Sequence, residues 1–130
     1  MFVLDTNTLI YFFKGQGRVA GRMFSEAPAS IGIPAIVLFE LETGIAKSTS
    51  PQKRSRQLKS LLDATILLPF SVAEAKASAE IRARLETKGK RIGSLDVLIA
   101  GTALANQAVL VSHNLAEFSR VDGLIVEDWY

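Results

Sequence analysis

The chain has 130 residues, 48% of them hydrophobic and 22% charged, and carries a formal net charge of +2 at pH 7. These proportions are typical of one ordered globular domain that is long enough to bury a core. The absence of cysteine excludes a disulfide framework and a thiolate metal site, and a single histidine argues against a zinc site.

The first half of the chain predicts alternating strands and helices. An apolar run at residues 2–4 predicts a buried strand, and the polar residues that follow can cap a helix that continues to Phe13. A second helix is predicted at residues 18–26 and a short strand at residues 30–33. A long helix should follow, with Pro34 in its first turn.

The second half continues this alternation. Its predicted elements are a basic amphipathic helix that begins near Pro51, a strand at residues 65–69, a helix at residues 71–88 capped by Ser71, a helix at residues 95–106 capped by Ser94, and strands at residues 108–112 and 124–126. The whole pattern predicts a single α/β domain with a mostly parallel central sheet flanked by helices. Such sheets bind ligands at the carboxyl ends of their strands.

Three stretches with almost no charge each hold a carboxylate. Asp5 lies in the first, Glu40 with Glu42 in the second, and Asp96 in the third, and none has a lysine or arginine near it in sequence. A carboxylate is rarely left unpaired in an apolar segment, because its desolvation is unfavourable. A shared divalent cation would satisfy all three segments. The alternatives are that Asp5 and Asp96 only stabilise helix starts, and that Glu40 pairs with a distant arginine.

Ligation by oxygen alone fits Mg²⁺ or Mn²⁺. Such a site can activate water and stabilise the leaving oxygen of a phosphodiester. The chain offers no Walker loop and no dinucleotide-binding glycine motif. A haloacid-dehalogenase-like phosphatase is disfavoured, because the second aspartate that its chemistry needs would stand where this chain has Asn7.

Four segments, in order along the chain, resemble the motifs of PIN domains, and specifically of VapC-type ribonuclease toxins. They are Phe2-Val3-Leu4-Asp5-Thr6-Asn7, the segment Pro34 to Gly44 with Glu40 before Leu-x-x-Gly, Ser94-Leu95-Asp96-Val97-Leu98-Ile99-Ala100, and Leu110 to Phe118. The resemblance covers residues 1–130 as one PIN domain. It implies that Asp5, Glu40 and Asp96 are the catalytic residues and bind the metal, and that Glu42 faces away.

The resemblance also implies supporting residues around the acidic site. These would be Thr6, Asn7, Ser112 and Asn114. Many relatives carry an aspartate where this chain has Asn114, and an amide supplies no charge. Glu117 lies close to Asn114 in sequence, but we expect its side chain to point outward.

Clustered cations predict a surface for the RNA backbone. The candidates are Lys53, Arg54, Arg56, Lys59, Arg82, Lys90 and Arg91. The alternative is that these residues form solvated helix faces.

The leading hypothesis is a metal-dependent endoribonuclease that is the toxin of a type II toxin–antitoxin system. The alternative is a catalytically silent PIN-like domain that binds RNA or a protein. The resemblance implies a VapB-like antitoxin as partner and a homodimer. Five consecutive apolar residues from Leu9 to Phe13 cannot all face one core, which also predicts an interface. The sequence shows no signal peptide and no membrane span, so we expect a cytoplasmic protein.

Overall fold

Five parallel strands form one sheet in the order β3-β2-β1-β4-β5. The structure is a computed structural model that describes all 130 residues. The strands are β1 (Phe2–Leu4), β2 (Ile31–Pro34), β3 (Ile66–Leu68), β4 (Val109–Val111) and β5 (Val126–Glu127). The predicted α/β fold is confirmed, and the sheet is wholly parallel.

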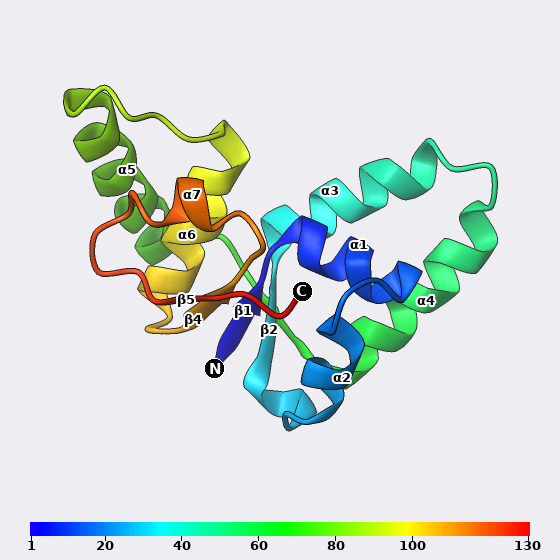
Figure 1. The fold of residues 1–130 in the computed structure, drawn as a ribbon. Coiled ribbons are helices and arrows are strands. Elements are labelled where there is room, and N and C mark those ends of the chain that lie inside the picture. The colour runs from blue at the N-terminus through cyan, green and yellow to red at the C-terminus, as the bar shows by residue number, and fades with distance from the viewer.

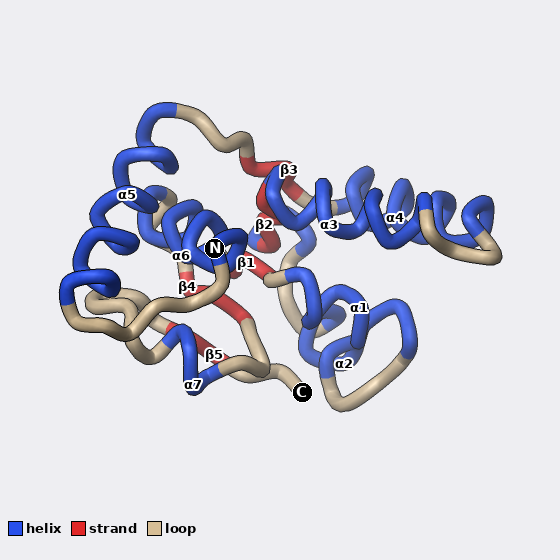
Figure 2. Tube along the Cα trace, turned by 90° about the horizontal axis from the view of Figure 1, so that it is seen from above, coloured by secondary structure: helices blue, strands red, loops and turns tan.

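Seven α-helices and one short 3₁₀ helix connect the strands. They are α1 (Thr6–Lys14), α2 (Val19–Phe24), the 3₁₀ helix η1 (Pro28–Ser30), α3 (Ala35–Ala46), α4 (Pro51–Ala64), α5 (Val72–Thr87), α6 (Ser94–Ala105) and α7 (Leu115–Phe118). Figure 2 shows α5 and α6 on one side of the sheet and α1 to α4 on the other. The sheet is therefore the middle layer of the domain.

The central strands are buried on both faces, which explains why they read as short continuous apolar runs. Val3, Leu4, Ile33, Leu110 and Val111 are fully buried. They belong to a core of 24 buried apolar residues that includes members of every long helix. No helix of the structure has the length and apolar character that a membrane crossing needs.

The starts of α3 and α6 differ from the sequence prediction, and several other element ends differ by one or two residues. Pro34 closes β2 and stands at the N-cap of α3, outside the helix, with an extended backbone. Ser94 is the first residue of α6 and Gly93 is its N-cap, so Ser94 does not cap the helix. The capping box that was predicted for α5 is present, because the side chains of Ser71 and Glu74 each accept from the other's backbone.

Two helical arms rise beyond the carboxyl ends of the strands (Figure 1). One arm contains α3 and α4, and the other contains α5, the start of α6 and the loop between them. The carboxyl edge of the sheet lies at the base of both arms. Residues that follow the strands and residues on the arms can therefore meet at one place.

The arm of α5 and α6 depends on a close contact between these two helices. Gly101 of α6 lies against Ser78 of α5, and a Cβ atom at Gly101 would stand only 2.8 Å from the Ser78 Cα. Backbone atoms cannot move aside as a flexible side chain can. Glycine at this position therefore allows α6, and with it Asp96, to pack where it does.

We expect Gly101→Ala to lower the free energy of unfolding by about 1–3 kcal/mol, as overpacked cores do. Gly44→Ala is the matched control, because Gly44 also lies within a helix and a Cβ there would meet nothing within 4 Å. The control should gain about 0.5–1 kcal/mol from the lower entropy of the unfolded chain. Urea denaturation of both variants tests this, and equal stability changes would contradict the proposed contact.

Candidate active site

Asp5 is held at the carboxyl edge of the sheet by the pairing of its two central strands. Leu4 of β1 pairs with Val111 of β4, and the Asp5 amide donates to the Val111 carbonyl at 3.1 Å. Asp5 is buried, with 5% of the residue exposed, and its Oδ1 accepts from the Thr8 amide at 2.9 Å. Asp5 is therefore also the N-cap of α1. The capping hydrogen bond uses Oδ1 and leaves Oδ2 free of this contact.

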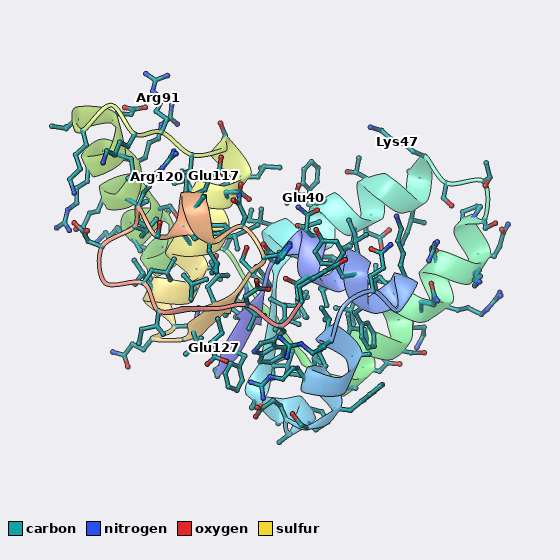
Figure 3. All side chains as sticks on the ribbon, in the orientation of Figure 1. Glu40, Lys47, Arg91, Glu117, Arg120 and Glu127 are labelled. Carbon is teal, nitrogen blue, oxygen red and sulfur yellow. The ribbon has the colours of Figure 1, made fainter.

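Glu40 enters the same region from the arm of α3 and α4. It is half-buried on α3, and its Oε1 accepts from the Thr6 hydroxyl at 2.7 Å. No arginine or lysine pairs with it, so the ion-pair alternative for Glu40 is not supported. Figure 3 shows Glu40 and Glu117 facing each other above the carboxyl edge of the sheet.

Asp96 lies in the first turn of α6, close to the other carboxylates. Its pKa is raised from 3.8 to about 6, first by burial and then by the charge of Glu117, with smaller contributions from Asp5 and Glu40. The start of a helix favours a negative charge and would lower this pKa, so burial and the neighbouring charges outweigh the effect of the α6 N-terminus. The carboxyl groups of Asp96 and Glu117 also hydrogen-bond, which requires a proton on one of them. Asp5, Glu40 and Glu117 therefore lie near enough to Asp96 to affect its ionisation, and these four carboxyl groups are called the carboxyl cluster below.

Glu117 corrects an expectation from the sequence, because its side chain points into the site. It belongs to α7, a four-residue helix that was not predicted. The Asn114 amide group donates to Glu117 Oε2 at 2.9 Å, and the Asn114 backbone amide donates to Ser112 Oγ at 3.0 Å. Ser112 is fully buried at the end of β4. Ser112 and Asn114 therefore fix the turn that presents Glu117.

The other predicted residues are not all brought together. Asn7 and Glu42 are exposed, and no hydrogen bond from either side chain reaches the four carboxyl groups. Thr8, which the sequence did not single out, is buried and donates to the Val111 carbonyl at 3.2 Å. Thr8 thus ties the start of α1 to β4, directly behind Asp5.

The cations that were predicted to contact RNA lie on both arms. Lys53, Arg56 and Lys59 are exposed on α4, whereas Arg82 and Arg91 line a cavity between α5 and α6. Two of the seven are paired with acids on their own helices, Lys59 with Asp63 at 3.0 Å and Arg82 with Glu86 at 3.1 Å. The remaining five have no ion pair, and they are Lys53, Arg54, Arg56, Lys90 and Arg91.

The carboxyl cluster fits a hard cation by its chemistry. None of the four acids has a lysine or arginine partner, and burial, together with the charge of the other three acids, raises the pKa of Asp96. Carboxylate oxygens are the ligands that Mg²⁺ and Mn²⁺ prefer. As placed, no group of three or more acidic or histidine side chains has metal-ligand geometry. Side-chain rotation would be needed to surround an ion.

Comparison with known proteins identifies the family of the chain. Residues 2–124 match the PIN domain family. The chain is 34% identical to the tRNA(fMet)-specific endonuclease VapC of Salmonella typhimurium, over 98% of this chain and 97% of that protein. It is 35% identical to Ribonuclease VapC2 of Rickettsia felis, over 99% of this chain and 98% of that protein.

Solved structures agree with these sequence matches. The fold superposes with a TM-score of 0.92 on the crystal structure of VapBC2 from Rickettsia felis bound to a promoter DNA fragment, at 34% identity over 99% of this chain and 98% of that chain. The TM-score is also 0.92 for DNA-bound VapBC from Salmonella typhimurium, at 33% identity and the same coverage of both chains. The chain therefore belongs to the PIN domain family, among the VapC ribonucleases.

Proposed function

We propose that this protein is the endoribonuclease toxin of a VapBC-like toxin–antitoxin system and that it hydrolyses RNA phosphodiester bonds at the carboxyl cluster. The convergence of Asp5, Glu40, Asp96 and Glu117 without a paired cation carries this proposal. The names of the relatives agree with it, since they are ribonucleases and a tRNA endonuclease.

Mg²⁺ or Mn²⁺ is the proposed cofactor, held by Asp5, Glu40 and Asp96, with Glu117 as a fourth candidate ligand. When bound, such an ion would lower the pKa of water and stabilise charge on the phosphodiester. The residues of the chain prepare the site for this. Thr6 donates to one Glu40 oxygen, and the Thr8 amide donates to one Asp5 oxygen, so the second oxygen of each of these two acids is free of these contacts.

Glu117 weakens the case for a catalytically silent domain. That alternative rests on Asn114, which supplies no negative charge where many relatives have an aspartate. In this structure the Asn114 amide group instead holds Glu117 at 2.9 Å, and Glu117 carries a carboxyl group to Asp96. The cluster therefore contains four acids despite the substitution.

A VapB-like antitoxin is the proposed protein partner, and a homodimer the proposed state of the toxin. The structures that resemble this chain include toxin–antitoxin complexes. An apolar groove of about 470 Å³ lies between α1, α2 and α4. Phe12 and Phe13 line it, and so does Phe24, which is 79% exposed. Such exposed apolar area is typical of a docking surface.

We expect Asp5→Asn and Asp96→Asn each to reduce RNA cleavage by more than about 100-fold, since even residues that only support metal ligands contribute about 10–100-fold. Cleavage of total RNA by the purified protein with Mg²⁺, Mn²⁺ or EDTA measures this. Glu42→Gln is the control, because Glu42 is exposed on the same helix as Glu40. Normal cleavage by a folded Asp96→Asn variant at matched metal concentration would remove Asp96 from the site.

The raised pKa of Asp96 predicts a pH-dependent stability of the metal-free protein. Between 3.8 and about 6 the folded chain binds this proton more tightly than the unfolded chain, so stability falls as the pH rises through this window. Asp96→Asn should remove that fall and be more stable than wild type near pH 7 by ~1 kcal/mol, after allowance for solvent screening.

Urea denaturation with a chelator, at about pH 4 and about pH 7, measures this difference. With saturating Mg²⁺ or Mn²⁺ the wild type should be more stable than Asp96→Asn. The ion stabilises the wild-type fold, and the variant has lost one of its proposed ligands. Parallel stability curves for the two proteins would contradict the raised pKa of Asp96.

We expect Phe24→Asp to weaken antitoxin binding by about tenfold or more and to leave cleavage by the free toxin unchanged, since Phe24 lines the groove and is exposed to a partner. Val72→Asp is the control, because Val72 is 65% exposed but lies on α5, away from the groove. Co-purification from the co-expressed operon tests the difference. Equal recovery of antitoxin with both variants would place the docking surface elsewhere.

A further inference from the structure

A second cavity, of about 340 Å³, lies between α5 and α6. Seven of its twelve lining residues are hydrophobic. This volume is at the lower end of the range for small-molecule sites, about 300–1,000 Å³. The cavity is separate from the apolar groove of α1, α2 and α4, and none of the four acids of the cluster lines it. Its size suits one small ligand or one nucleotide.

The wall of this cavity combines an apolar face with cations. Phe70, Ile92 and Leu98 contribute apolar surface, and Arg82 and Arg91 contribute positive charge. Glu86 also lines the cavity and pairs with Arg82, so two arginines against one glutamate leave one net positive charge. Arg91 has no acidic partner. A ligand with an apolar ring and a negative group would complement this wall.

The loop that carries Arg91 is held by a hydrogen bond from Arg120. The Arg120 side chain donates to the Arg91 carbonyl at 2.9 Å, which joins the loop between α5 and α6 to the segment after α7. Figure 3 shows Arg91 at the end of this arm and Arg120 beside Glu117. The Arg91 backbone is therefore held in place, while its guanidinium group forms no ion pair and can contact a ligand.

The cavity and the carboxyl cluster lie on two sides of one helix start. Ser94, the first residue of α6, lines the cavity, and Asp96 follows two residues later. The first backbone amides of α6 have no acceptor within the helix and no side-chain cap. Ser78 Oγ belongs to the same wall but is buried against Gly101, so the polar groups that a ligand can reach here are the first amides of α6 and the Ser94 side chain.

We propose that this cavity binds one nucleotide of the RNA substrate, next to the phosphate at the carboxyl cluster. The base lies against the apolar wall and its phosphate contacts Arg91 and the start of α6. An RNA strand that crosses the start of α6 then places one phosphate at the acids and the neighbouring nucleotide in the cavity. The site selects the substrate by a flanking base. This inference rests on the ribonuclease function proposed above.

Binding is tested first without catalysis, by titrating isotope-labelled protein with each of the four nucleoside 5′-monophosphates and with inorganic phosphate. We expect amide NMR shifts around Ala79 and Ser94 with at least one nucleotide, and weaker shifts with phosphate alone. Ala79→Phe fills the cavity from an exposed helix position and should abolish the nucleotide response. Ala83→Phe, exposed on the same helix outside the cavity, should keep it. No nucleotide shifts, or shifts retained by Ala79→Phe, would overturn the proposal.

The role in cleavage is tested with a short RNA that contains the mapped cut site and an abasic nucleotide at one position at a time. Wild type should lose about tenfold in kcat/KM at one flanking position, as expected for one stacked base. Ala79→Phe should cleave the intact RNA about tenfold more slowly and lose nothing further at that position. Additive losses, or an Ala79→Phe variant that changes only the oligomeric state in light scattering, would overturn the nucleotide site.

These outcomes separate the two proposals. A wild-type protein that cleaves no RNA with either metal contradicts the ribonuclease function, while the nucleotide titration still decides the cavity. If the wild type cleaves RNA but Ala79→Phe and Ala83→Phe behave alike, only the proposal of a nucleotide site is contradicted.

Discussion

The repulsion among four carboxyl groups is the constraint on which the rest of this structure depends. Parallel strands bring Asp5 and Ser112 to one edge, the two arms add Glu40 and Asp96, and α7, which follows β4, adds Glu117. Like charges this close disfavour the folded chain unless protons, hydrogen bonds or a cation offset them. Hydrogen bonds from Thr6, from the Thr8 amide and from Asn114 offset part of this repulsion, and the raised pKa of Asp96, caused first by burial and then by Glu117, favours its protonated form.

The scaffold around the cluster explains how such a site can persist. The core strands are buried on both faces, and α6 is locked against α5 by the contact of Gly101 with Ser78. Each acid is fixed to a rigid element and no long loop carries one. A rigid fold can hold charges together without a metal, as the proposed ion site requires.

The sequence singled out the acids that interrupt apolar segments, whereas Glu117, which interrupts none, was expected to point outward. Asp5, Glu40 and Asp96 stand out because each is an isolated charge in a buried element. Glu117 lies in a four-residue helix within polar sequence, where no periodicity indicates which way a side chain points. The starts of α3 and α6 were misplaced by one residue, because Pro34 and Ser94 are each common at neighbouring cap positions. The cavity of Arg82 and Arg91 joins residues from two helices and a loop, and local patterns do not encode such a junction.

The central claim is that the four acids form a site for a divalent cation. Crystals soaked in Mn²⁺ and measured near the manganese absorption edge would test it most directly. We predict an anomalous difference peak between Asp5, Glu40, Asp96 and Glu117, with carboxylate oxygens at roughly 2.0–2.3 Å. The same soak of an Asp96→Asn crystal should give a weaker peak or none. A wild-type crystal with no peak at this position, or with manganese bound only elsewhere, would contradict the account.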